Sequence, residues 1–310
     1  MFYLKWKMKI IMIILKKKKE GFPGAMKIDT LQIIIEQSKK TICKINCKGG
    51  GCGTGFFALI PFPDKTVRLR TLMTNNHVLE PSDIEIGKKI EFSMNDDKKQ
   101  FNILIDKKRK VYTSELYDIT IIEIKKVDGI KDDSYLEIDD RIFEGIKNFA
   151  NQSVYLLHFP NGGKANYSDG IIKTYGLDGY NIQHSCTTYE GSSGSPILNF
   201  KNNRLIGIHK GKKEILNSNL GTFLKLPIEK FNEKFINNNF NENENNINNE
   251  NNDNINSKFK DNKNLINLNE NNNIISNISK KQENNFEKDK IFQNENNNII
   301  NIISNIAKIQ

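Results

Sequence analysis

This sequence contains few cysteines, the residues that can cross-link a chain through disulfides. Only four cysteines occur among 310 residues, namely Cys43, Cys47, Cys52 and Cys186. A secreted domain held together by disulfides usually carries more, in a recognisable framework. The three early cysteines form no CxxC pair and have no histidine beside them, so their spacing does not favour a zinc site. We expect four reduced thiols, several of them buried on strands.

Long hydrophobic runs are also missing. The run Ile10–Leu15 has only six residues, whereas a membrane-spanning helix needs roughly 20. Lysines follow it at once, and no small-residue cleavage site of a signal peptide is present. Patterned sequence begins just after Met26, which is a plausible alternative start. We expect a cytoplasmic protein without a stable membrane span; secretion or membrane association through the N-terminal segment is the alternative.

Basic charge is plentiful, but aromatic residues are not interleaved with it. The net charge is +9, and residues 1–20 alone carry seven lysines against one glutamate, a net of +6. A nucleic-acid-binding surface usually combines such charge with aromatic side chains along a stripe. We interpret the lysines as a solvated run and expect no nucleic-acid partner.

Apolar residues make up 37% of the chain, which is low for a chain folded throughout. The polar excess lies after residue 236, because asparagine is more than a third of residues 237–310. Such low-complexity composition is typical of disorder. The sequence therefore predicts a Lys-rich segment over residues 1–30, a folded domain over 31–236 and an Asn-rich tail over 237–310.

The folded domain is predicted to consist of short strands that are rich in β-branched and aromatic residues and separated by turn signals. They are Thr41–Cys47, Gly55–Ile60, Arg68–Met73, Lys89–Ser93, Phe101–Ile105, Asp118–Ile124, Ser153–Phe159, Gly170–Tyr175, Asn181–Cys186, Pro196–Phe200, Leu205–His209 and Gly221–Leu226. This pattern predicts an all-β sandwich or barrel. Strand density falls near residues 126–150, which predicts two β subdomains. Short helices are expected at Leu31–Ser38 and Ile228–Ile236.

One serine lies in a turn suited to close backbone packing. Gly191–Pro196 reads Gly-Ser-Ser-Gly-Ser-Pro and joins two predicted strands. Its glycines allow the chain to fold sharply and to aim amide groups at one point. Amides arranged in this way stabilise the oxyanion that forms when a carbonyl is attacked. By itself, however, a cluster of serine and glycine is more often a flexible turn.

A serine nucleophile needs a base, and the base needs an orienting carboxylate. Among four histidines, His77 ends an apolar strand, where a side chain is both exposed and rigidly supported. Asp118 opens an alternating apolar strand that would hold its carboxylate at the edge. Each residue taken singly is more often structural, so the prediction depends on their combination with Ser193.

Together these segments resemble four ordered landmarks of trypsin-like peptidases. The landmarks are Gly53–Phe56, Thr74–Leu79, Tyr117–Ile122 and Gly191–Pro196. The resemblance covers about residues 38–230 and is nearest to the branch that includes bacterial glutamyl endopeptidases and HtrA-type proteases. Tyr155–Pro160 also resembles a strand and turn of the family, although His158 and Phe159 depart from its pattern.

The resemblance implies an all-β, chymotrypsin-like fold of two six-stranded antiparallel barrels with the active site in the cleft between them. It implies a serine endopeptidase in which Ser193 is the nucleophile, His77 the base and Asp118 the orienting carboxylate. Gly191 and Ser193 would supply the oxyanion-hole amides. The substrate would be a polypeptide, and a mechanism through an acyl-enzyme needs no metal or organic cofactor.

A further resemblance concerns specificity. Leu205–Gly211 resembles the Gly-Ile-His segment of glutamyl endopeptidases and of viral chymotrypsin-like cysteine proteases. In those families this histidine, together with a threonine five residues before the nucleophile, contacts a Glu or Gln at the cleaved position. The matching residues here are His209 and Thr188. Packing at a strand end is the alternative for His209, and His184 is interpreted as structural.

Two other functions stay open at this point. A protease fold can serve as a catalytically silent binding module, although such domains usually lack a triad member and this sequence keeps all three. The Asn-rich tail could instead be the functional element, through self-association by polar stacking. No sequence feature addresses the oligomeric state.

Overall fold

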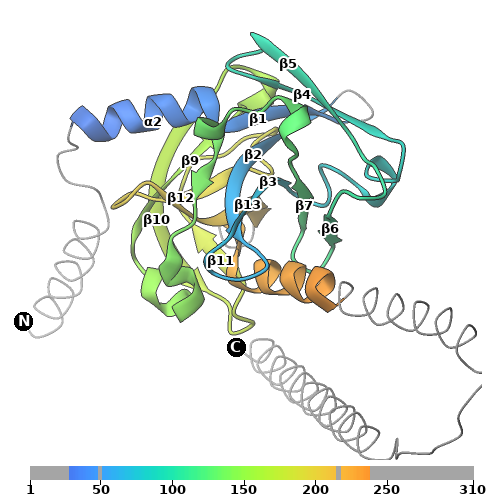
Figure 1. Cartoon of the computed structure of the whole chain (residues 1–310). Coiled ribbons are helices and arrows are strands. Elements are labelled where there is room, and N and C mark those ends of the chain that lie inside the picture. Colours follow the sequence, from blue (N-terminus) through green and yellow to red (C-terminus); the bar gives the residue numbers. More distant parts are fainter. Residues whose placement is uncertain (1–27, 48–50, 214–217, 238–310) are drawn as a thin grey trace, which may run out of the picture. The chain divides into compact units, whose positions relative to one another are not determined.

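A computed structural model describes residues 28–47, 51–213 and 218–237. Most of the regular elements are strands, with an α-helix near each end of the described part (Figure 1). The first helix, α2 (Ile28–Lys40), includes the predicted Leu31–Ser38 and extends it at both ends. Asp29 in its first turn and two lysines in its last turn complement the helix dipole.

The first sheet contains eight strands. They are β1 (Ile42–Asn46), β2 (Cys52–Pro61), β3 (Arg68–Thr74), β4 (Lys89–Met94), β5 (Lys99–Leu104), β6 (Val111–Ser114), β7 (Ile119–Glu123) and β8 (Leu136–Glu137). Seven follow the antiparallel order β5-β4-β1-β2-β3-β7-β6, and β8 pairs with β2 in parallel. The sheet curls into a half-barrel, so it differs in detail from the six-stranded closed barrel that the sequence predicts.

The second sheet is a closed barrel of six strands. They are β9 (Ser153–His158), β10 (Asn166–Tyr175), β11 (Asn181–His184), β12 (Pro196–Asn199), β13 (Arg204–Lys213) and β14 (Ser218–Phe223), in the order β10-β11-β14-β13-β12-β9. All neighbouring strands are antiparallel. The predicted chymotrypsin-like fold is confirmed.

The central strands of the first sheet are buried on both faces, because successive side chains point to opposite sides of a strand. Phe56 and Phe57 are adjacent on β2, yet Phe56 joins the larger apolar core and Phe57 the smaller one. Ile121 and Ile122 on β7 divide in the same way. Each fully buried side chain of this size stabilises the fold by about 1.5–3 kcal/mol. Packing on both faces therefore fixes these strands and the loops at their ends.

The segment between the two sheets is irregular, as the drop in strand density predicts. It contains β8 and four 3-10 helices, at Lys126–Asp128, Asp132–Ser134, Asp140–Glu144 and Ile146–Phe149. A buried ion pair anchors its start, because Arg109 donates to both carboxylate oxygens of Asp128 at 2.7 and 2.9 Å. Two other 3-10 helices, Pro81–Asp83 and Pro160–Gly162, lie in loops.

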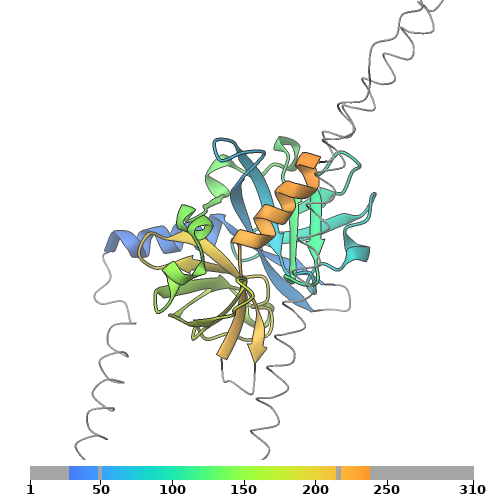
Figure 2. The same ribbon diagram turned by 90° about the horizontal axis from the view of Figure 1, so that it is seen from below.

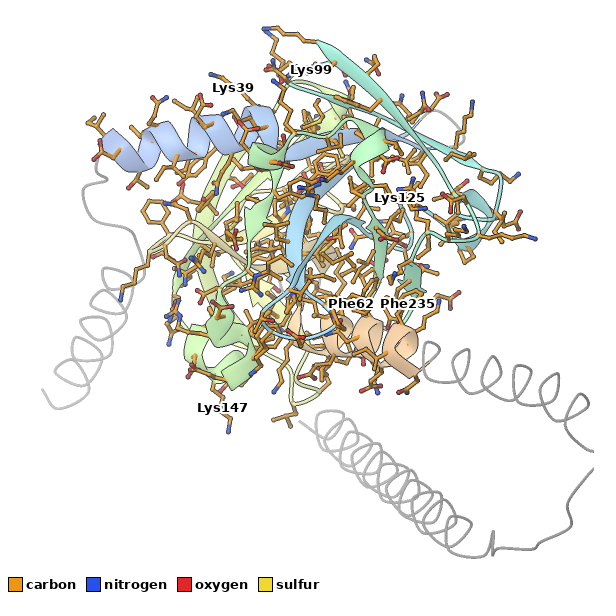
Figure 3. The ribbon with its side chains drawn as sticks, in the orientation of Figure 1. Lys39, Phe62, Lys99, Lys125, Lys147 and Phe235 are labelled. Carbon is orange, nitrogen blue, oxygen red and sulfur yellow. The ribbon has the colours of Figure 1, made fainter. Side chains whose placement is uncertain are left out.

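The second described helix, over residues 225–237, follows the second barrel and returns to the first sheet (Figures 1 and 2). Asn232 donates to the carbonyl of Pro61 at 3.1 Å, and Lys234 to that of Val111 at 3.0 Å. The ring of Phe231 on this helix meets that of Phe62 edge to face at 5.6 Å. Phe235, one turn further along the helix, packs against Phe231 (Figure 3). This helix ties the end of the domain to its first half.

Some expectations lie beyond what the structure tests. Residues 1–27 and 238–310 fall outside the described residues, so the Lys-rich segment and the Asn-rich tail stay predictions. All four cysteines are free thiols, with Cys43 and Cys186 buried. In the described part of the chain, no helix combines the length and the apolar character that a membrane crossing requires.

Candidate active site

His77 and Asp118 meet at the same end of two neighbouring strands of the first sheet, because His77 follows β3 and Asp118 precedes β7. Nδ1 of His77 lies 3.0 and 2.9 Å from the two carboxylate oxygens of Asp118. The backbone N–H of His77 also donates to Oδ1 at 3.2 Å. Because both carboxylate oxygens face one ring nitrogen, Nδ1 carries a proton and Nε2 is free to act as the acceptor.

Local backbone structure explains this contact. His77 lies in the turn after β3, among buried neighbours, and its side chain is 49% exposed. Asn75 in the same turn donates through Nδ2 to the carbonyl of Asp118 at 2.8 Å. Asp118 ends the tight turn between β6 and β7 with φ of +48°, a left-handed conformation that Asp and Asn adopt more readily than other non-glycine residues.

The serine turn depends on two glycines with positive φ. Gly191 has φ of +79° and Gly194 has φ of +86°. A Cβ on Gly194 would lie 1.9 Å from the carbonyl oxygen of Thr54, and one on Gly191 would lie 2.5 Å from that of Phe159. Only glycine therefore fits either position.

Ser193 lies between these glycines, in the turn that precedes β12. Its side chain is partly exposed, and its hydroxyl donates to the carbonyl of Lys210 at 3.3 Å. Among the described residues, the Ser193 hydroxyl makes this one hydrogen bond. It is therefore not bonded to the His77 ring in this rotamer. Burial lowers the pKa of the Lys210 ammonium. The negative charge of Asp118 partly offsets this lowering.

Two backbone N–H groups of the turn remain free for a ligand. In the described part of the chain, neither Gly191 nor Ser193 donates its N–H to a protein acceptor. The carbonyl of Glu190 accepts from Asn161 N–H at 2.6 Å. Because a trans peptide points its N–H opposite to its carbonyl, this contact turns the Gly191 N–H away from Asn161.

Sequence reasoning missed the groups that hold this turn. Ser192 is fully buried; its hydroxyl lies 2.7 Å from Nδ1 of His158 and accepts from Tyr189 N–H at 3.0 Å. Thr54 on β2 donates through Oγ1 to the carbonyl of Gly191 at 2.7 Å and through its backbone N–H to that of Ser193 at 2.8 Å. The departures of His158 and Phe159 from the family pattern were the available signal.

The expected specificity residues lie on β13 and on the loop before the serine turn, and each has a different hydrogen-bond partner. His209 is 2% exposed, and its Nδ1 lies 3.1 Å from Nε2 of His184. The Thr188 hydroxyl donates to Oδ1 of Asn219 at 2.7 Å. Burial lowers the pKa of His184 to about 3 and lowers that of His209 well below its usual value. Both rings are therefore neutral at pH 7.

Beside the serine turn lies a cavity of about 340 Å³, lined by Gly51, Cys52, Asn161, Glu190 and Gly191. Its lining includes Cys52 on β2 as well as Gly191 of the serine turn. Across the described residues, no cluster of His, Cys, Asp or Glu could hold a metal ion.

Comparison with known proteins decides the family. The family described as the trypsin-like peptidase domain matches residues 53–208, half of the chain, from Gly53 on β2 to Ile208 on β13. The chain belongs to the trypsin-like peptidase family. This peptidase is a serine-type endopeptidase, a hydrolase whose substrates are polypeptides.

The peptidase also aligns with solved structures. A serine endoprotease from Yersinia pestis matches with 15% identity and a TM-score of 0.49, over 68% of each chain. Rv3671c from M. tuberculosis H37Rv, a serine-to-alanine mutant in its inactive form, matches with 18% identity and a TM-score of 0.43. That alignment covers 65% of the peptidase and 90% of the mycobacterial chain.

Proposed function

We propose that the peptidase cleaves peptide bonds through a triad of Ser193, His77 and Asp118. The observation that carries this proposal is the contact of both Asp118 carboxylate oxygens with Nδ1 of His77, at 2.9 and 3.0 Å. The Asp118 carboxylate keeps the proton of the neutral His77 ring on Nδ1. Nε2 is then unprotonated, as a general base requires.

The nucleophile becomes active when substrate binds. The Lys210 carbonyl, which accepts the Ser193 hydroxyl in the free enzyme, lies on β13 just beyond the last contact of this strand with the serine turn. A substrate strand that adds to this edge offers its own N–H to that carbonyl. The hydroxyl then rotates to Nε2 of His77, and such catalytic hydrogen bonds commonly form only in the complex.

Hydrolysis follows in two steps. Ser193 Oγ forms a bond to the substrate carbonyl carbon while His77 takes its proton, and the carbonyl oxygen becomes an oxyanion. The free N–H groups of Gly191 and Ser193 stabilise that oxyanion. His77 then gives the proton to the departing amine, whose chain leaves through the cavity beside Gly191. Water, activated by His77, hydrolyses the resulting acyl-enzyme.

We extend the proposal to a preference for Gln or Glu at the cleaved position, read by His209. Among the described residues, Nδ1 of His184 is buried without a hydrogen-bond partner. A proton there would leave a buried donor unpaired, which is costly, so the proton is on Nε2 and donates to His209. His209 is then neutral and protonated on its own Nε2. Its ring also hydrogen-bonds the backbone carbonyl of Leu220, so a substrate side chain competes with that carbonyl for the donor.

This neutral donor favours Gln over Glu. The Thr188 hydroxyl already donates to Asn219, so its oxygen can only accept a further hydrogen bond. A Gln carboxamide offers an acceptor to His209 and a donor to Thr188. A Glu carboxylate offers only acceptors and brings a charge to a site whose two imidazoles are neutral.

The proposed triad is tested with Ser193→Ala and His77→Ala. Each should remove hydrolysis of a peptide library and labelling by a fluorophosphonate probe, with thermal unfolding unchanged. Labelling of the Ser193→Ala variant equal to that of wild type would overturn the assignment. A binding module would bind peptides without any wild-type turnover.

The proposed specificity is tested with matched peptides that differ only at the cleaved position. We expect kcat/KM to fall in the order Gln, Glu, then Arg and Phe, and His209→Ala to remove the difference. Equal rates, or a preference for Arg, would contradict this reading and leave the triad untouched.

A further inference from the structure

The residue before the nucleophile is held by a buried, uncharged pair. Ser192 has no exposed surface, and its hydroxyl lies 2.7 Å from Nδ1 of His158. The same hydroxyl accepts from Tyr189 N–H at 3.0 Å. The Ser192 hydroxyl is therefore held at two points, one on the loop before the turn and one on β9, in addition to the backbone contacts of Ser192 with Tyr189 and Ser195.

The partner ring is itself held rigidly. His158 is the last residue of β9, pairs with Asn166 on β10 and is 2% exposed. Burial lowers its pKa to about 4, so the ring is neutral at pH 7. Because neither group is charged, the pair avoids the large desolvation cost of a buried ion pair. A hydrogen bond in this dry interior is also stronger than one in water.

The rest of the turn leaves its backbone little freedom. The carbonyls of Glu190, Gly191 and Ser193 accept from Asn161, Thr54 Oγ1 and Thr54 N–H respectively. Gly194 N–H donates to the carbonyl of His209 at 3.0 Å. Between the two N–H groups that have no protein acceptor in the described part of the chain, Ser192 is the residue whose own side chain anchors the turn to β9, beside the Thr54 and Ser195 hydroxyls that bond the Gly191 and Ser192 carbonyls. Its position therefore controls where both of those donors point.

We propose that His158 is a positioning residue, which through Ser192 keeps the Gly191 and Ser193 N–H groups aimed at the oxyanion. This inference rests on the proposed function, because it concerns the same oxyanion hole. A merely structural role for the pair would affect stability alone. A positioning role acts on the transition state, since an oxyanion hole is useful only when its donors are fixed before the reaction.

The test compares three variants on β9. His158→Leu removes the contact with Ser192. His158→Asn is the conservative variant, because its amide reaches the place of Nδ1. Tyr155→Phe is the matched control: it removes a buried hydroxyl that bonds Gln37 at 2.7 Å on the same strand and does not touch the turn. The measurements are kcat, KM, the melting temperature and the affinity for a peptide aldehyde, whose hemiacetal oxygen needs the oxyanion hole.

We expect His158→Leu to lower kcat by about 100-fold, the loss typical of one oxyanion donor, with KM within twofold. Aldehyde affinity should fall by a similar factor, and His158→Asn should recover most of both. Tyr155→Phe should lower the melting temperature and leave kcat and aldehyde affinity unchanged. A folded His158→Leu variant with kcat and aldehyde affinity within twofold of wild type overturns the inference.

Ser192→Ala provides a second route if His158→Leu does not fold. It should reproduce the loss in kcat, and combining it with His158→Asn should cost little more, because the two residues act as a unit. Unchanged kcat in Ser192→Ala overturns the inference by itself. A wild-type protein that neither hydrolyses peptides nor binds the aldehyde would refute the proposed function instead.

Discussion

Replacing Asp118 by Asn isolates the role of one carboxylate in the proposed triad. Asn keeps the size of the side chain and, like Asp, tolerates the left-handed backbone that φ of +48° imposes at this position. Its carbonyl can still accept the His77 backbone N–H that Oδ1 accepts in the native chain at 3.2 Å. The fold should therefore be unaffected, and the melting temperature should stay within about 2 °C, as expected for a change below about 0.5 kcal/mol.

The effect on catalysis should be large. Both carboxylate oxygens lie within hydrogen-bond distance of Nδ1, at 2.9 and 3.0 Å, so an amide must present its NH2 to the ring or lose its other contact. Facing a donor, His77 takes the tautomer with its proton on Nε2 and cannot accept the Ser193 proton. Loss of the right tautomer costs about 10⁴-fold in kcat, which corresponds to about 5 kcal/mol of transition-state stabilisation.

The assay is steady-state hydrolysis of a Gln-containing peptide at pH 7, with thermal unfolding measured on the same samples. Asp118→Ala is the comparison variant, and it should lose both activity and stability because Ala adopts positive φ less readily. If Asp118→Asn retains more than a tenth of wild-type kcat, the contact between Asp118 and His77 does not set the tautomer and the reasoning fails.

Three further predictions concern the fold around the site. Gly194→Ala should destabilise the protein by more than about 3 kcal/mol, because its Cβ would overlap the Thr54 carbonyl at 1.9 Å; a native-like melting temperature would contradict this close approach. Asp128→Ala should lower the free energy of unfolding by about 3–5 kcal/mol, because it leaves the charge of the buried Arg109 guanidinium unpaired. Urea denaturation measures this loss, and a change below about 1 kcal/mol would contradict the prediction. The free energy of unfolding should be highest above pH 6.5 and fall as the pH is lowered towards 4. The reason is that burial lowers the pKa of His158 to about 4 and that of His184 to about 3, so the unfolded chain binds more protons in this window, at up to about 1.4 kcal/mol per pH unit for each histidine. Denaturant titrations at pH 7 and pH 5 check this slope, which His158→Asn should reduce.

The strand pattern of the sequence anticipates most of the fold, because β-branched residues bounded by turn signals report directly on local structure. Each of the twelve predicted strands overlaps a strand of the structure. The two strands that were not predicted, β6 (Val111–Ser114) and β8 (Leu136–Glu137), are four and two residues long. Such short pieces depend on their partners, β7 and β2, and carry little periodicity of their own.

The site was predictable only where chemistry requires a particular residue type in sequence. The approach of His77 to Asp118 follows from motif order. The contacts of Ser192 with His158, and of His184 with His209, join residues 34 and 25 positions apart and depend on barrel closure. The left-handed backbone of Asp118 likewise comes from the tight turn between β6 and β7, which no residue pattern near it announces.

Thr54 belongs to the first sheet, yet two of its donors hold carbonyls of the serine turn in the second barrel. The position of the proposed nucleophile therefore depends on contacts from both halves of the domain. During synthesis, the ability to cut protein should emerge only after both halves have folded and joined. Chains that are still being synthesised would therefore not be cleaved by neighbouring copies that are only partly folded.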